Sequence, residues 1–392
     1  RASPWTSGPM PERDQRLINF ATHGGNGTSI TSYSAYNNSA AYTNINTAAA
    51  ADNVKVGTGF VTTTALTASR TINSLYLNGG GVSVTAPVNS ILTLTSGGII
   101  ANNGISTLGN SGMVVAFGGT EAGISVVSGA TLNIDAMLTS TANVTKGLDG
   151  TLQFNTRQRF NTGASYFTVN GGTVILNGGS STLFPGVQGG TFGQGLAVGP
   201  GATLNLNGNS QMVGRLRSAN NSGIPGAGGT ITSATPAVLV SVTTGEDSNW
   251  TGSIQGSLGF AKAGSNTQNI RSLNSYTGDT LINGGTVNLT DNGRLSATNA
   301  VSVNYAALAL LNSGLYGQDD RLNDSAVITL RGGNLSMTGR ENTQSVETVG
   351  AIILDQGQNN LTITLGGGAV RSAVLSTGNL TQNNYATLLF GG

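Results

Sequence analysis

The sequence has no cysteine and only one histidine, His23, in 392 residues. The lack of cysteine excludes disulfides, thiolate metal sites and cysteine nucleophiles. His23 stands in the loop-like segment HGGNG without a second histidine to help it bind a metal or complete a catalytic triad. We therefore expect no metal, no cofactor and no histidine-based catalysis.

Charged residues are also scarce, at 8% of the chain against a usual share of about 25%. The 17 basic and 16 acidic residues leave a net charge of +1. Nucleic-acid binding requires a basic stripe to neutralise phosphates, and binding to an anionic membrane surface requires a similar patch. The composition therefore predicts neither partner, and it also lacks the high net charge that usually accompanies disorder.

Long hydrophobic runs are absent as well, because no stretch approaches the roughly 18 apolar residues of a membrane-spanning helix. We therefore expect no membrane insertion of this segment. The sequence begins at Arg1 without a methionine or a leader-like apolar segment, which suggests a processed or excerpted piece of a longer product.

What the sequence does have is glycine, with 60 residues, roughly twice the usual frequency of about 7%. From about Asn53 onward, short runs alternate apolar residues with Ser, Thr or Asn, as in LTLTSGG from Leu92. A period of two is typical of β-strands. Glycine pairs bound these runs and supply the positive φ angles of tight corners. The segment NTAAAADNV from Asn46 is the one plausible helical turn.

An internal repeat organises these strands. A turn, then Gly-Gly or Gly-Ala, then a short apolar alternation recurs seven times, as NGGGVSV from Asn78, VSGATLNI from Val127, VNGGTVIL from Val169, GPGATLNL from Gly199, INGGTVNL from Ile282, LRGGNLSM from Leu330 and LGGGAVRS from Leu365. Such a repeat buries its apolar residues by stacking coils on one another. The sequence therefore predicts an all-β fold, a parallel β-helix with irregular coils.

At roughly 20 to 30 residues per coil, the chain would form about 13 to 20 coils and a rod of about 60 to 95 Å. Stacked Asn and Thr side chains are expected to bond one another at the corners. The repeat register predicts these inward residues: Val169, Val174, Leu176, Leu204, Leu206, Ile282, Val287 and Leu289.

The first residues differ from the repeat. Residues 1–50 are expected to form an extended, capping or contact segment, and residues 51–392 the β-helical domain. The early part of residues 1–50 combines prolines with a tryptophan and close charges. The candidate assembly residues there are Trp5, Glu12, Arg13, Asp14 and Arg16. This segment would serve as a linker or lid at the end of the fold, or as an arm that reaches a neighbouring subunit. For the cluster of Tyr33, Tyr36 and Tyr42 we expect a packing or capping role rather than stacking on a ligand.

Two stretches carry a family resemblance, NWTGSIQGSLGFAKAG from Asn249 and NSYTGDTLINGGTVNLTDNGRLS from Asn274. They resemble the passenger-associated, or autotransporter-associated, β-strand repeats of bacterial surface proteins, and VTKGLDGTLQF from Val144 is similar to the lead-in strand of that family. The matching positions are Trp250, Thr251, Gly252, Tyr276, Thr277, Gly278, Asn283, Gly284, Gly285 and Thr286. The resemblance implies a right-handed parallel β-helix (solenoid) exported to the bacterial cell surface, and it implies no particular activity.

Catalytic β-helices cluster acids and bases on one face, but the sequence shows no such cluster. The pairs Asp319–Asp320 and Glu246–Asp247 are adjacent, and adjacent strand residues point to opposite faces, so we interpret both as turn residues. Calcium-binding nonapeptide repeats would need an Asp in each copy, and among the copies that carry the repeat only Asp135 is present.

Arginines occur at i, i+2 spacing twice, and each pair would share one strand face. These pairs are Arg157 with Arg159 and Arg215 with Arg217. They would form a solvated face, or hold an acidic sugar or a neighbour's carboxylate.

These observations favour a non-enzymatic, extracellular rod or filament component of a bacterial surface that assembles end to end, either as a homopolymer or with the rest of a longer chain. The alternative is an adhesin that binds a surface glycan or another cell. A polysaccharide-degrading enzyme is the third hypothesis.

Overall fold

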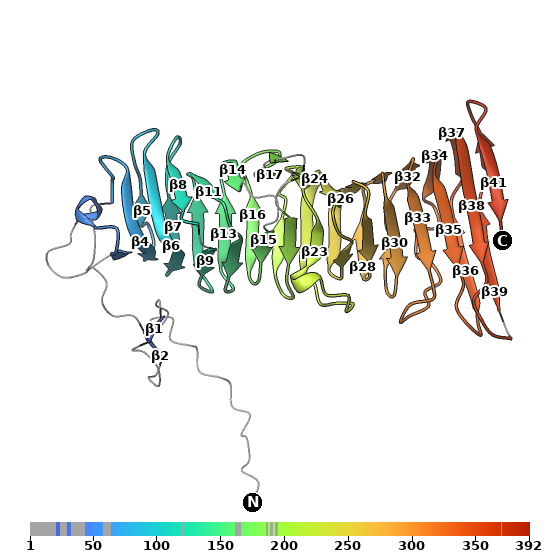
Figure 1. Cartoon of the computed structure of the whole chain (residues 1–392), viewed down its shortest axis with the longest axis horizontal. Helices are drawn as coiled ribbons and strands as arrows, with labels where there is room; N and C mark the ends of the chain where they lie inside the picture. The colour runs from blue at the N-terminus through green and yellow to red at the C-terminus, as the bar shows by residue number, and fades with distance from the viewer. Residues whose placement is uncertain are drawn as a thin grey trace, which may run out of the picture.

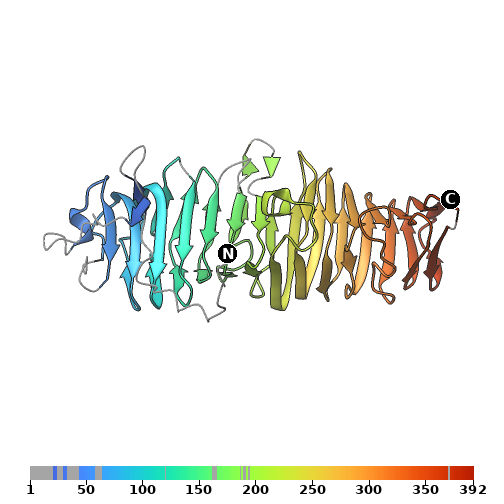
Figure 2. The same cartoon turned by 90° about the horizontal axis from the view of Figure 1, so that it is seen from below.

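The computed structural model describes residues 21–23, 30–32, 44–57, 64–119, 121–160, 166–185, 187–188, 191–192, 195–369 and 371–392. Its coils stack along one axis as an elongated rod of about 13 turns (Figures 1 and 2). The described part of the chain contains parallel β-sheets and no α-helix. The prediction of a parallel β-helix is confirmed.

Three long parallel sheets form the faces of the rod. Sheet I runs its full length through β5 (Ser83–Val84), β7 (Ile105–Leu108), β10 (Thr131–Ile134), β13 (Thr151–Phe154), β16 (Thr173–Leu176), β21 (Thr203–Asn205), β24 (Thr230–Val242), β26 (Ser253–Ala263), β29 (Thr280–Asn283), β32 (Ala300–Asn304), β34 (Val327–Arg331), β37 (Ile352–Gln356) and β40 (Leu380–Gln382). Its side members are β22 (Gln211–Val213), β28 (Leu273–Tyr276) and β31 (Arg294–Leu295).

The other two long sheets divide the rod between them. Sheet II occupies the N-terminal half, with β3 (Asn53–Val56), β4 (Arg70–Asn78), β6 (Ile91–Asn102), β8 (Val114–Phe117), β9 (Ala122–Val126), β11 (Met137–Ser140), β12 (Val144–Gly147), β14 (Gln158–Phe160), β15 (Tyr166–Val169), β17 (Leu183–Pro185), β20 (Gly195–Val198) and β23 (Leu216–Ser218). Sheet III occupies the C-terminal half, with β25 (Ser248–Trp250), β27 (Thr267–Ile270), β30 (Thr286–Thr290), β33 (Ala307–Leu311), β35 (Asn334–Thr338), β38 (Gln358–Thr364) and β41 (Thr387–Gly391).

Small elements complete the described structure. Near the C-terminus β36 (Gln344–Val349) pairs in parallel with β39 (Ser372–Thr377). Two antiparallel pairs are β1 (Ala21–His23) with β2 (Ile30–Ser32), and β18 (Val187–Gln188) with β19 (Thr191–Phe192). Two 3-10 helices are η2 (Ile45–Thr47) and η3 (Ala219–Asn221), so the segment expected to form a helical turn near Asn46 contains one short 3-10 turn.

Coil length is irregular, as the uneven spacing of the repeat copies suggests. Leu132 pairs with Leu152, 20 positions later, whereas Val174 pairs with Leu204, 30 positions later. Extra residues leave the rod as loops between strands, because the strands themselves must stay in register to bury their apolar side chains.

The core is a continuous apolar column inside the three sheets. Strands such as β16 and β30 alternate buried with partly exposed residues, as their period-two sequences predict. Each of the inward residues predicted from the repeat is at most 1% exposed, which confirms its register: Val169, Val174, Leu176, Leu204, Leu206, Ile282, Val287 and Leu289.

Asparagine side chains bond one another between coils at the corners. Asn207 Nδ2 donates to Asn177 Oδ1 at 2.9 Å, Asn177 Nδ2 to Asn155 Oδ1 at 3.2 Å, and Asn155 Nδ2 to Asp135 Oδ1 at 2.7 Å. This four-residue ladder confirms the expected stacking of polar corner residues. Asp135 ends the ladder as an acceptor.

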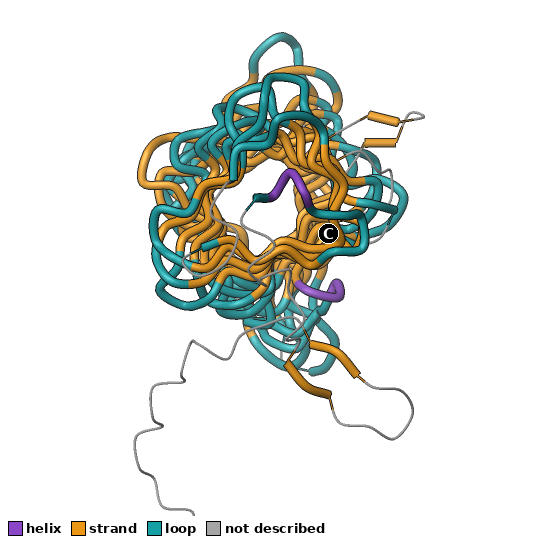
Figure 3. The backbone as a smooth tube through the Cα atoms, turned by 90° about the vertical axis from the view of Figure 1, so that its left-hand side faces the viewer, coloured by secondary structure: helices purple, strands orange, loops and turns teal. Residues whose placement is uncertain are grey.

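The two ends of the described rod differ. At the N-terminal end η2 lies beyond the first strands (Figure 1) and, seen along the axis, over the middle of their ring (Figure 3), and Ile45 is fully buried. At the C-terminal end β41 has a strand partner, β38, on one side. Leu389 and Phe390 of β41 are 58% and 62% exposed.

Candidate functional site

The Gly-Gly corner of the repeat encloses a buried lysine ammonium group. Asn283, Gly284, Gly285 and Thr286 form the turn between β29 and β30, with φ of +127° and +61° at the two glycines. Lys262, fully buried in the preceding coil, donates from Nζ to the carbonyl oxygens of Gly264 at 2.6 Å and Gly284 at 2.9 Å. The corner therefore ties two successive coils together.

The corner at Gly171 and Gly172 repeats this arrangement. Lys146, also fully buried, donates from Nζ to the carbonyl oxygens of Leu148 at 2.5 Å, Gly150 at 2.6 Å and Gly171 at 2.7 Å. We call Lys146 and Lys262, with these carbonyl groups, the lysine corners. Sequence reasoning missed both lysines, although each stands one coil before a Gly-Gly copy, in the segments VTKG and FAKAG.

The positive charge of the buried ammonium group, and not only its packing, matters in the lysine corners. Burial lowers the pKa of each lysine to about 8, while Asp149 near Lys146 and Asp247 near Lys262 act in the opposite direction. Both lysines therefore remain protonated at neutral pH. Charge-assisted hydrogen bonds to several carbonyl groups offset the cost of burying the ammonium.

The first aromatic motif, Trp250-Thr251-Gly252, lies inside the rod. Trp250 is fully buried, and its Nε1 donates to Asn274 Oδ1 at 3.1 Å. Thr251 Oγ1 donates to Ser218 Oγ at 2.7 Å. A Cβ at Gly252 would lie 2.2 Å from the carbonyl oxygen of Gly229, so glycine is required for this coil to approach its neighbour.

The second aromatic motif, Tyr276-Thr277-Gly278, is packed between coils in the same way. Tyr276 is 1% exposed, and its hydroxyl bonds the hydroxyl of Thr280 at 2.7 Å, while burial raises the pKa of Tyr276. The Thr277 N–H donates to the carbonyl of Gly256 at 3.0 Å, and a Cβ at Gly278 would lie 2.5 Å from the carbonyl oxygen of Leu258. The structure therefore places the motif residues in coil-to-coil packing and brings them to no common surface.

The two arginine pairs have different environments. Arg157 and Arg159 are exposed, as expected for a solvated face. Arg215 instead pairs with Glu246 at 2.5 Å, and Arg217 lies over the ring of Tyr166 at 3.4 Å from its centroid. The second pair is therefore partly buried, and a carboxylate and an aromatic ring from other coils approach it.

The adjacent acids lie in loops, as expected for turn residues. Glu246 is held by its arginine partner, and Asp319 Oδ1 accepts the N–H of Val346 at 2.8 Å. In the part of the chain that the structure describes, no three Asp, Glu or His side chains gather where they could hold a metal ion. His23, Trp5 and the charged assembly residues have no described side chain, and neither do Tyr33, Tyr36 and Tyr42.

A buried ionisable pair of a different kind lies near the C-terminal end. Glu347, 2% exposed, accepts the backbone N–H groups of Arg321 and Leu322 at 2.7 and 2.8 Å. The fully buried guanidinium of Arg321 donates to the carbonyl oxygens of Asp291, Leu311 and Gly293. Burial raises the pKa of Glu347 to about 7, although the two N–H groups act against this rise.

This raised pKa predicts a pH-dependent stability. The folded protein binds the proton of Glu347 near pH 7 and the unfolded chain near pH 4.5, so the folded state holds more protons between these values. We expect the free energy of unfolding to rise by about 2 kcal/mol as the pH falls from 7.5 to 5. In thermal melts, the melting temperature of the intact chain should rise more steeply over this window, as the pH falls, than that of Glu347→Gln. Parallel slopes would contradict the assignment.

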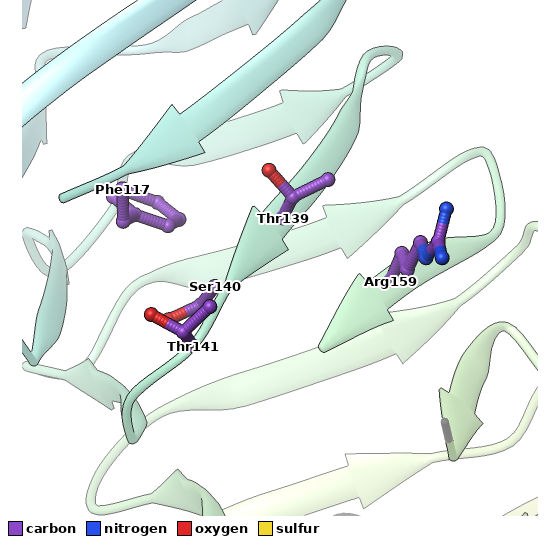
Figure 4. A pocket seen from close by; sticks show the side chains of 5 residues that line it. All are labelled: Phe117, Thr139, Ser140, Thr141 and Arg159. Atoms are coloured by element: carbon purple, nitrogen blue, oxygen red, sulfur yellow. The ribbon is translucent and has the colours of Figure 1, made fainter. Parts of the chain in front are cut away.

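Among the residues that the structure describes, side chains line two hollows that open on the surface. One, of about 220 Å³, is lined by Phe117, Thr139, Ser140, Thr141 and Arg159 (Figure 4). The other, of about 540 Å³, follows the ends of β33, β35 and β38 and is called the C-terminal groove below. It is lined by Asn312, Ser313, Gly314, Thr338, Gly339, Arg340, Glu341, Asn342, Leu365, Gly366 and Gly367.

Comparison with known proteins gives one informative similarity. The chain is 29% identical over 317 residues to the Adhesin BmaC autotransporter of Brucella suis biovar 1 (strain 1330). The match covers 78% of this chain and 8% of that protein, so the chain spans a small fraction of its relative's length. No protein-family model matches the chain, and no solved structure matches it significantly.

In the described residues no helix is long and apolar enough to cross a membrane. The chain is thus a parallel β-solenoid similar to part of an autotransporter adhesin.

Proposed function

We propose that this chain is a non-catalytic β-helical segment of a bacterial surface passenger of the autotransporter-associated repeat type, displayed outside the cell for adhesion. The observation that carries the proposal is the similarity to an autotransporter adhesin over 78% of a chain whose described residues form one stacked solenoid. Such a rod holds its loops and grooves at fixed positions along its axis, which suits repeated contact with another surface.

An adhesion assay tests this function. Beads coated with the purified chain should adhere to epithelial monolayers or to other bacteria several-fold more than beads coated with albumin. Soluble chain added in excess should compete, since specific adhesion saturates. Adherence equal to that of albumin beads on every surface tested would contradict the adhesive function.

We also propose end-to-end assembly, because the C-terminal coil leaves apolar side chains and strand edges uncovered. Leu380 and Tyr385 are 56% and 98% exposed, beside the exposed Leu389 and Phe390. Unpaired strand edges are templates for a further strand. A coil from a second copy, or from the rest of a longer chain, would cover them. A contact between this end of one copy and the opposite end of the next would join two different surfaces, so it would be heterologous and would not close.

Light scattering tests the assembly. The intact chain should form species longer than one rod, and Leu389→Lys should shorten them, because a charge on the edge strand β41 opposes pairing. Deleting residues 1–20 tests the proposed contact role of Trp5, Glu12, Arg13, Asp14 and Arg16. Monomeric intact protein at every concentration would contradict the assembly, and unchanged assemblies after the deletion would contradict the role of that segment.

A further inference from the structure

The C-terminal groove crosses three successive coils beside an unusually long loop. Leu289 pairs with Leu310, 21 positions later, whereas Leu310 pairs with Met337, 27 positions later. The additional residues form the loop between β33 and β34, whose Leu315 and Tyr316 are 68% and 50% exposed. Asn312, Ser313 and Gly314 of this loop line one side of the groove.

The floor of the groove is hollow because glycines form it. Gly314, Gly339, Gly366 and Gly367 all line it. A Cβ at Gly366 would lie 2.0 Å from the carbonyl oxygen of Arg340, so that coil can approach its neighbour only without a side chain. At Gly367 a Cβ would make an ordinary contact, 3.5 Å from Glu341 Cγ, so a side chain can be added there to fill the groove.

The walls offer hydrogen-bond donors and acceptors in balance. Arg340 is oriented by its Nη1, which donates to the carbonyl oxygens of Asn312 and Gly314 at 3.3 and 3.1 Å. Among the described residues no acid pairs with Arg340, and no cation pairs with Glu341. The exposed Ser313 supplies a hydroxyl, and Leu365, half exposed, supplies an apolar face.

We infer that the C-terminal groove binds a neutral saccharide, an inference that rests on the proposed adhesive function and names its ligand class. A sugar hydroxyl both donates and accepts, so vicinal hydroxyls match a wall that carries one guanidinium, one carboxylate and neutral hydroxyls. The C–H face of a sugar ring would pack on Leu365. One positive and one negative side chain give no net attraction for a phosphate chain, and the lining is too polar for a lipid tail.

Binding of neutral disaccharides to the intact chain tests the inference. Lactose, maltose and cellobiose serve as neutral probes and sialyllactose as an acidic one, measured by titration calorimetry and saturation-transfer NMR. At least one neutral probe should bind with a dissociation constant on the order of 1 mM. Gly367→Phe, which fills the groove, should weaken that binding about tenfold or more. Glu341→Gln should weaken it several-fold, since it removes a charged acceptor from an exposed position.

The matched control is Gly119→Phe, because Gly119 is a surface glycine whose added Cβ would meet nothing within 4 Å. This variant should bind as the unmodified chain does. Binding of no neutral probe, binding of sialyllactose alone, or equal binding by Gly367→Phe would overturn the inference. If Gly367→Phe beads adhere like unmodified beads and no disaccharide competes, adhesion stands and the groove assignment fails. If beads do not adhere while disaccharide binding remains, the adhesive function fails.

Discussion

Replacing Gly285 by valine should lower the free energy of unfolding by more than about 4 kcal/mol, or prevent folding of the surrounding coils. Its φ of +61° disfavours any side chain with a Cβ. The new Cβ would also lie 2.4 Å from Lys262 Nζ, 2.5 Å from the carbonyl oxygen of Asn266 and 2.6 Å from that of Gly264. Because two of these atoms belong to the backbone, the coil itself would have to move.

Gly245→Val is the matched control for this substitution. Gly245 also has a positive φ, +81°, but an added Cβ there would meet nothing within 4 Å. Its cost should be confined to backbone strain, about 1 to 2 kcal/mol. Chemical denaturation gives the free energy of unfolding of both variants and of the unmodified chain. The loss in Gly245→Val measures backbone strain, and the additional loss in Gly285→Val measures the collision of the new side chain. Equal losses for both would show that the lysine corner does not depend on its glycine.

Replacing Lys146 by methionine should destabilise the fold by about 3 kcal/mol, because methionine fills much of the same space without donating a hydrogen bond. The carbonyl oxygens of Leu148, Gly150 and Gly171 would each lose the ammonium that they now share. Amide hydrogen exchange should also speed up around Gly171, since the corner joins two coils and loosens locally.

Lys55→Met serves as the control for the lysine substitution. Lys55 is a partly exposed lysine on β3, with its Nζ 4.7 Å from the ring centroid of Tyr76. Its replacement should change the free energy of unfolding by less than about 1 kcal/mol. Losses of the same size at Lys55 and Lys146 would contradict a special role for the buried ammonium.

The architecture follows from patterns that are local in the chain. Val174 and Leu176 could be assigned to the interior because strands alternate sides with a period of two, and the preceding Gly-Gly marks where the strand begins. That Asn side chains would form a ladder could be predicted for a similar reason, because corner residues of one coil must stack on those of the next.

The lysine corners were not predictable from the same patterns. A lysine on a short strand beside glycine resembles a solvated edge residue in sequence. Its burial depends on carbonyl groups from two coils, such as those of Gly150 and Gly171, meeting at one point. The contact of Arg217 with Tyr166 likewise joins residues that are 51 positions apart.

The sequence by itself determined the fold class, the strand periodicity and the inward face of the repeat, because these depend on nearest neighbours along the chain and on one repeated unit. The tertiary structure alone decided which polar groups meet between coils. Coil lengths vary from 19 to 30 residues, as at Thr267 and Val174, so the position above a given residue cannot be counted from a fixed period. The lysine corners, the hydrogen bonds of Glu347 to the backbone of Arg321 and Leu322, and the C-terminal groove all depend on that stacking register.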